Sequence, residues 1–217
     1  MRSGKYTVQD ALKGIVVGEL ARYDSPESAA IGVVQGQNGN YISSHSEKCA
    51  KKQVPKNRKL FSARTPDALV VRRNKYPQRD DNAVDAAIKG EGGVLSQGQV
   101  LYHGGSLPDG DNQISRPLST SLSPTVAYND AIRHLDLYTD KKIRLYVLKA
   151  VDDSVPAYLY ESKRSGLGHE LEVLIGSGVH VKDKKVVCSA IESLCVDCMT
   201  GEKEDFTVEV VSATLTA

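Results

Sequence analysis

The second half of the chain is patterned as a succession of short apolar stretches separated by glycine, proline and acidic residues. Stretches of this length, in which apolar and polar positions alternate, are typical of β-strands. They predict strands over residues 100–103, 118–122, 143–150, 155–160, 171–175, 179–181, 185–188 and 206–211. Strands therefore dominate the chain from the first of these ranges onward.

Helices and loops are expected mainly in the first half. Near-helical spacing of apolar residues predicts helices over residues 7–23 and 81–89, and a serine cap followed by proline starts another over residues 124–137. Residues 24–39 are rich in Ser, Gly and Asn, which indicates loops around one short apolar element at 29–34. Strands and helices so segregated predict the α+β class, with sheets packed on one another and helices at one side.

Length and composition fit a globular protein. The chain has 217 residues, 40% of them hydrophobic and 25% charged, with a formal net charge of +1. This length suits one domain, or one domain with a sizeable extension, and the near-neutral charge gives no general attraction to nucleic acids or membranes. No apolar run approaches the roughly 18 residues of a membrane helix, and no hydrophobic signal region follows Met1. We therefore expect a cytoplasmic protein without membrane association.

Cysteine usage gives no support for a metal site. The four cysteines are Cys49, Cys188, Cys195 and Cys198, and the last three have the spacing C-x6-C-x2-C. Zinc would need a fourth ligand. We expect reduced thiols and no bound metal.

Basic residues are concentrated in one part of the chain, between residues 41 and 79, where eleven Lys and Arg stand against two acids. We call residues 48–79 the basic segment; residues 69–71 within it predict a short strand. Such a run is consistent with a solvated surface. The alternative interpretation is a surface that faces nucleic acid, an acidic protein or the phosphates of a dinucleotide.

Two glutamates lie on a strand that is otherwise apolar. Along residues 171–175 the side chains alternate, so Glu170 and Glu172 share one face with Leu174. Burying a carboxylate costs several kcal/mol, roughly, unless it is paired or hydrogen-bonded. An edge strand with one wet face explains the pattern, and so does a functional pair of carboxylates.

Two earlier strands also carry polar side chains. The sequence Tyr102-His103-Gly104 ends the strand at 100–103, and Ser119-Thr120-Ser121 lies in the strand at 118–122. Ser119 and Ser121 share a face, and Thr120 points away from it.

The order Tyr-His-Gly, Ser-Thr-Ser, Glu-x-Glu resembles the ADP-ribosyltransferase superfamily, and in particular its toxin-type branch. The resemblance covers about residues 94–185. It implies a split β-sandwich or barrel of two small, roughly perpendicular sheets around a cleft for NAD. Residues 94–217 would form this catalytic core, and residues 1–93 a helical and loop-rich N-terminal extension that includes the basic segment.

The resemblance also implies roles for individual residues. Glu172 would stabilise the positive charge that develops on the ribose, and Ser119 would hold Glu172 by a hydrogen bond. Glu170 matches the residue that orients an arginine acceptor in relatives that modify arginine. The residues expected to contact NAD are Tyr102, His103, Gly104, Ser119, Thr120 and Ser121.

His103 departs from the toxin-type pattern, which has arginine at this position to bind the NAD phosphate. Histidine at this place resembles instead the diphtheria-toxin and poly-ADP-ribosyl branch, where it bonds an adenosine-ribose hydroxyl. Imidazole is a poor phosphate ligand at neutral pH, so Arg116, Arg133 and the basic segment are the candidates for that contact.

The function expected from these patterns is mono-ADP-ribosylation of a macromolecule with NAD as substrate, with protein arginine as the preferred target. Two alternatives stay open: ADP-ribosylation of RNA or DNA guided by the basic segment, and a non-catalytic NAD-binding module of the same fold. A phage protein, a secreted effector and a toxin with an antidote are all compatible settings.

Overall fold

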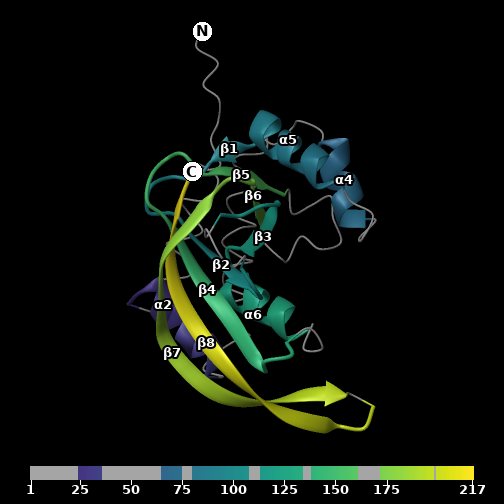
Figure 1. Ribbon diagram of the computed structural model, residues 1–217, viewed down its shortest axis with the longest axis vertical. Helices are drawn as coiled ribbons and strands as arrows, with labels where there is room; N and C mark the ends of the chain where they lie inside the picture. Colours follow the sequence, from purple (N-terminus) through teal and green to yellow (C-terminus); the bar gives the residue numbers. More distant parts are fainter. Residues whose placement is uncertain are drawn as a thin grey trace.

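The computed structural model describes residues 24–35, 65–74, 80–107, 113–133, 138–160, 172–197 and 199–217. The helices in these ranges are α2 (Pro26–Val34), α4 (Asp67–Asn74), α5 (Asp81–Glu91) and α6 (Pro124–Ile132). The strands are β1 (Gly93–Val94), β2 (Val100–Gly104), β3 (Leu118–Ser121), β4 (Lys142–Ala150), β5 (Pro156–Leu159), β6 (Glu172–Ile175), β7 (His180–Asp197) and β8 (Glu202–Thr216). The α+β class predicted from the sequence is confirmed (Figure 1).

The strands form one hydrogen-bonded sheet of eight in the order β1-β5-β6-β3-β2-β4-β8-β7. Only β4 and β8 run parallel, and the other neighbours are antiparallel. A single registered pair, Tyr102 with Ser121, connects β2 to β3. The sheet therefore consists of two four-stranded halves with a weak seam between them, and the two sheets expected from the sequence are these halves.

The two halves share one hydrophobic core. On β4, Tyr146 and Leu148 face this core, and on β6 in the other half Val173 and Ile175 face it too. Residues in a strand point alternately to opposite faces, so the odd-numbered residues of β4, such as Leu145, face away from this core. The core between the halves explains why the chain curls into a sandwich-like shape.

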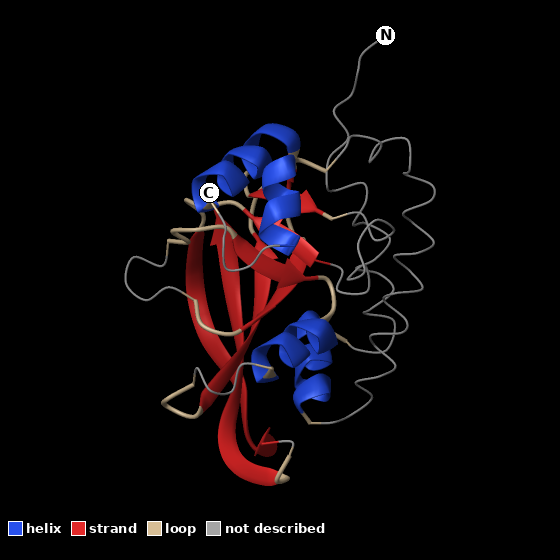
Figure 2. Cartoon of the chain, turned by 90° about the vertical axis from the view of Figure 1, so that its right-hand side faces the viewer, coloured by secondary structure: helices blue, strands red, loops and turns tan. Residues whose placement is uncertain are grey.

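Helices cover the outer faces in two pairs (Figure 2). The pair α2 and α6 packs on β2, β4 and β8 through a second cluster that includes Val33, Ala127 and Leu145. Each of these helices starts with a serine cap and a proline, at Ser25 and Ser123, as the sequence indicates for α6.

The other pair, α4 and α5, packs on β5 and β6. Leu69 of α4 and Ile88 of α5 are fully buried against Tyr160 and Leu174. The strand predicted over residues 69–71 is wrong, because these residues belong to α4. Three consecutive apolar residues do not separate a strand from one turn of helix, and the structure buries Leu69 alone of the three.

A long curved hairpin of β7 and β8 extends beyond the rest of the sheet (Figure 1). The short strands expected over 179–181 and 185–188 are parts of the continuous β7, and the one over 206–211 is part of β8. Register shifts interrupt the pairing at three places, the first between Lys182 and Lys185. The length of the hairpin could not be predicted from the sequence, because its far half is largely exposed and therefore needs no alternation of apolar and polar residues.

Some expectations concern residues that are not described, among them the helix over 7–23. The helix expected over 124–137 ends at Ile132, and residues 134–137 lie outside the described ranges. Within those ranges, none of the helices has the length and apolar character needed to cross a membrane.

Candidate active site

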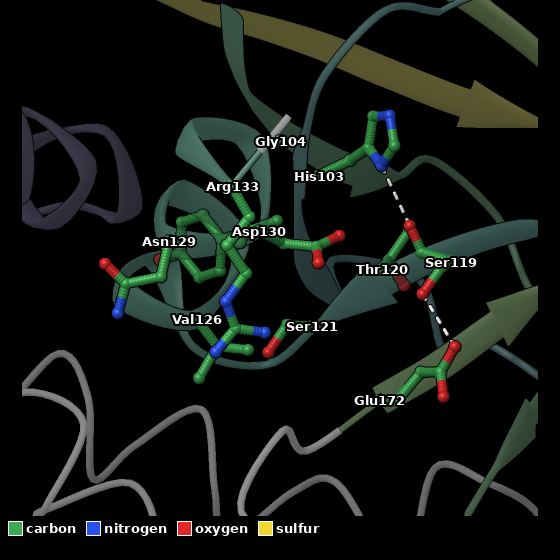
Figure 3. A pocket seen from close by; sticks show the side chains of 12 residues that line it. His103, Gly104, Ser119, Thr120, Ser121, Val126, Asn129, Asp130, Arg133 and Glu172 are labelled. Atoms are coloured by element: carbon green, nitrogen blue, oxygen red, sulfur yellow. Dashed lines mark hydrogen bonds between the residues drawn. The ribbon is translucent and has the colours of Figure 1, made fainter. Parts of the chain in front are cut away.

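Glu172 and Ser119 meet on one face of neighbouring strands. β3 and β6 are antiparallel, with Ser121 opposite Glu172 and Ser119 opposite Leu174. Residues at diagonal positions on one face lie within reach of each other, and the Ser119 hydroxyl donates to Glu172 Oε1 at 2.6 Å. The contact between Ser119 and Glu172 that the resemblance implied is therefore present (Figure 3).

The other two hydroxyls of the Ser-Thr-Ser strand are used within the protein. Thr120 points to the opposite face, as predicted, and donates to the Val173 carbonyl at 2.6 Å while only 4% exposed. Ser121 Oγ accepts from the backbone N–H of Ser123, next to the start of α6. Thr120 therefore fastens β3 to β6, and Ser121 fastens the turn that leads into α6.

Arg72 of α4 also binds Glu172, a contact that was not predicted from the sequence. Its Nη1 lies 3.0 Å from Glu172 Oε1, and each side chain is only 12% exposed. The only indication of Arg72 in the sequence was the basic segment itself, because a concentration of positive charge can supply an ion-pair partner for a carboxylate. Nothing in the spacing distinguished Arg72 from the other ten basic residues of that segment.

His103 lies at the end of β2, with its ring turned away from Glu172 (Figure 3). Its Nδ1 lies 2.8 Å from the Ser119 carbonyl, so Nδ1 carries the proton and donates. The ring stacks on Tyr146, with centroids 6.2 Å apart. Burial lowers the pKa of His103, and the Ser119 and Ser106 backbone groups and the charge of Asp130 oppose that shift only in part. His103 is therefore held neutral.

A neutral ring that donates from Nδ1 has an acceptor at Nε2. This atom is buried and has no hydrogen-bond partner among the described residues. Nε2 could accept a hydrogen bond from a hydroxyl group that reached it. In addition, the hydrogen bond from His103 to the Ser119 carbonyl connects β2 to β3, and the side chain of the same serine binds Glu172.

Tyr102 and Gly104 have packing roles that the sequence did not indicate. The Tyr102 ring is 3% exposed, and its hydroxyl donates to the Pro26 carbonyl at 3.4 Å. A Cβ on Gly104 would lie 1.9 Å from the Ala127 carbonyl oxygen of α6. Glycine is therefore required here because α6 packs directly on β2, whether or not a ligand also approaches.

A cavity of about 140 Å³ lies beside these residues. Its walls come from β2, β3, β6 and α6, and they include His103, Ser119 and Glu172 together with Asp130 and Arg133. Figure 3 shows the Arg133 side chain extending from α6 past Ser121, with Glu172 across the cavity on β6. Arg116, the other candidate named from the sequence, is exposed and does not line the cavity.

Several expected site residues lie outside the described ranges. They are Glu170, the loop over residues 161–169, Cys49, Cys198 and the basic segment except residues 65–74. Cys188 is a half-buried free thiol, and Cys195 is exposed. Among the residues that are described, no three His, Cys, Asp or Glu side chains come together as metal ligands would.

No protein-family model matches the sequence, and no curated protein matches it. Among solved structures, the chain is similar to C2-I, the enzymatic component of the C2 toxin of Clostridium botulinum, with 14% identity, a TM-score of 0.33 and 94% of this chain covered. It spans 46%, or about half, of C2-I. It is also similar to Vis, an ADP-ribosyltransferase toxin from Vibrio splendidus, with 16% identity, a TM-score of 0.35 and coverage of 100% of this chain and 87% of Vis. A structure of Vis in complex with agmatine gives 13% identity, a TM-score of 0.36 and coverage of 99% and 79%.

Proposed function

We propose that this chain is an NAD-dependent mono-ADP-ribosyltransferase in which Glu172 is the catalytic carboxylate. The observation that carries the proposal is the hydrogen bond of 2.6 Å from Ser119 to Glu172 at the wall of a cavity. The motif order along the chain supports it, since Tyr102-His103-Gly104, Ser119 to Ser121 and Glu172 lie on three adjacent strands around that cavity.

The chemistry requires a fixed negative charge. The bond between the nicotinamide nitrogen and ribose C1′ breaks, its electron pair leaves with nicotinamide, and positive charge develops on the ribose. A carboxylate that is largely shielded from water, as Glu172 is, stabilises that charge more strongly than one in water. An acceptor then adds its lone pair to C1′ and loses a proton. Glu172 suits this role because its Oε1 is held by two donors, whereas no described residue donates to Oε2.

The remaining cavity residues would bind the substrate. His103 Nε2 offers a buried acceptor for a ribose hydroxyl. Arg133 is the cavity residue suited to the diphosphate, because it is exposed and positively charged. Gly104, Tyr102, Thr120 and Ser121 would shape the walls through the packing described above.

The direct test is the variant Glu172→Gln. It keeps the shape of the side chain and removes its charge, so release of nicotinamide from NAD should fall by ~10²-fold or more. Glu209→Gln is the matched control, because Glu209 is a strand carboxylate that pairs with Arg144. Activity of Glu172→Gln within about twofold of the wild type would contradict the role of Glu172. Absence of nicotinamide release by the wild-type protein with lysate present would contradict the function itself.

We further propose protein arginine as the acceptor. The support is Glu170, two residues before Glu172 and on the same expected strand face. A guanidinium has a pKa above about 12 and is a poor nucleophile while charged; a carboxylate can hold it and help to remove its proton. Glu170→Gln should abolish transfer to protein while slow hydrolysis of NAD persists. Parallel loss of transfer and hydrolysis would contradict this role.

The nucleic-acid alternative has less support from the described part of the basic segment. The guanidinium of Arg72 is committed to Glu172 and largely buried, so it does not belong to an exposed phosphate-binding surface. Nuclease treatment of labelled lysate tests the alternative, since label on protein survives it and label on RNA or DNA does not. Calorimetry separates an enzyme from a pure NAD-binding module, because only the enzyme consumes its ligand.

A further inference from the structure

Helix α4 is anchored so that Arg72 faces the candidate active site. Leu69 is fully buried in the cluster with Leu174 of β6, and its carbonyl accepts from the Tyr160 hydroxyl at 3.2 Å. Residues three apart on a helix lie on the same side, so the anchoring of Leu69 also sets the position of Arg72. Leu174 and Glu172 share one face of β6. The hydrophobic anchor and the ion pair are therefore two contacts of one docked helix.

Arg72 and Ser119 bind the same oxygen of Glu172. Arg72 Nη1 lies 3.0 Å from Oε1, and Ser119 Oγ lies 2.6 Å from it. The two donors come from different elements, α4 and β3. Two donors on one oxygen restrict the torsion of the carboxylate, and no described residue donates to Oε2.

The pair has features that packing alone does not explain. Removing two charges from water is costly, and a buried ion pair is weak evidence for stability. Arg72 Nε is also buried, and none of the residues that the structure describes accepts a hydrogen bond from it. A buried N–H without an acceptor is unfavourable, so the guanidinium is not placed to satisfy its own donors. The hydrogen bond that Arg72 makes among the described residues is to Glu172.

We propose that Arg72 is a positioning residue of the active site, which together with Ser119 holds Oε1 of Glu172 and thereby directs Oε2 at the ribose carbon. This inference rests on the proposed function. It assigns part of the basic segment to the catalytic apparatus, with α4 as an element that activity requires.

The role predicts a specific kinetic pattern. Arg72→Gln should lower kcat for nicotinamide release by about tenfold or more and leave KM for NAD within about twofold, because the lost interaction acts in the transition state through Glu172. Arg72→Lys should recover part of the loss, since it restores the charge without the planar fork. Arg144→Gln is the matched control, as it breaks an Arg–Glu pair of 3.1 Å between β4 and β8 and should change neither constant.

Two results would overturn the proposal. A rise in KM with kcat unchanged would make Arg72 a substrate-binding residue. Unchanged kcat and KM, with a lower melting temperature, would make it only a tie between α4 and β6. A melting curve for each variant keeps these outcomes distinct from loss of the fold.

A double-mutant cycle tests whether Arg72 acts through Glu172. In the Glu172→Gln background, Arg72→Gln should cause no further loss of rate, whereas independent roles would give multiplied losses and contradict the inference. The same four proteins are compared by urea unfolding, where the pair should show coupling without any need for activity. A wild type that releases no nicotinamide but shows this coupling contradicts the proposed function alone. An active wild type with an unaffected Arg72→Gln variant contradicts the positioning role alone.

Discussion

The Ser119 hydroxyl donates to Glu172 Oε1 at 2.6 Å across the pairing of β3 and β6, while the hydroxyl of the next residue, Thr120, donates at the same distance to the Val173 carbonyl on the other face. Alternation along one strand thus gives two adjacent hydroxyls different tasks. One contacts the carboxylate of the candidate active site, and the other fastens the strand that carries it. The pair allows catalysis and stability to be tested side by side.

Ser119→Ala and Thr120→Val should therefore affect different properties: the first should lower the catalytic rate, and the second should lower the stability of the fold. Loss of the Ser119 hydroxyl should lower kcat by about tenfold with little change in stability, because Glu172 remains paired with Arg72. Thr120→Val removes a buried hydroxyl that donates to the Val173 carbonyl, which should destabilise the protein by about 1 kcal/mol with kcat nearly unchanged at low temperature. Nicotinamide release and urea unfolding measure the two effects. The same loss of kcat in both variants would contradict the division of roles.

His103 is best tested with two substitutions. Asparagine places an N–H donor close to the position of Nδ1, so His103→Asn should keep the bond to the Ser119 carbonyl and lose the Nε2 acceptor. Alanine loses both. We expect both variants to raise KM for NAD several-fold and only His103→Ala to lower the melting temperature. An unchanged KM in His103→Asn would show that Nε2 does not contact the substrate.

The enclosed ring of His103 also predicts a dependence of stability on pH. Burial lowers its pKa below the ordinary value of 6.5. When the pH falls below that value, the unfolded chain takes up a proton that the folded protein does not, so folding stability decreases until the pH passes the folded pKa. The slope is at most about 1.4 kcal/mol per pH unit. Urea unfolding at about pH 7.5 and about pH 5.5 should show a larger loss for the wild type than for His103→Asn. Equal losses would mean that the ring is free to protonate in the fold.

The sequence was informative where one pattern had one physical cause. Alternation of side chains predicted that Glu172 shares a face with Leu174, and the structure shows Leu174 buried under α4 and α5 on that face. Serine caps and proline predicted the start of α6. The α+β class followed from the segregation of strands and helices.

The sequence was uninformative where tertiary packing decided the outcome. Three apolar residues at 69–71 fit a strand locally, but burial of Leu69 alone against Tyr160 makes them one side of a helix. Arg72 could not be singled out, because its role depends on a contact with a residue one hundred positions away. From the sequence, Gly104 was interpreted as a place where a ligand approaches the backbone closely. In the structure, the backbone of α6 also lies against this glycine.

Gly104 gives the last prediction, in which helix packing and ligand binding have different consequences. A methyl group at position 104 would lie 1.9 Å from the Ala127 carbonyl and 2.8 Å from the Ala131 Cβ, so α6 would have to move. Backbone has little room to yield in a packed interface, and Gly104→Ala should cost about 3 kcal/mol or more of the free energy of unfolding.

Gly90 provides the matched control, since it lies within α5 and a Cβ there meets no atom within 4 Å. Gly90→Ala should stabilise the protein by about 0.5 kcal/mol or more, because alanine loses less backbone entropy in a helix. Urea unfolding of the two variants measures the contrast. If Gly104 is glycine only so that a ligand can approach, Gly104→Ala will unfold like the wild type and bind NAD more weakly. Loss of stability and displacement of α6 together would instead show that the glycine sets the distance between α6 and β2, and with it the width of the cavity that Asp130 and Arg133 share with Glu172.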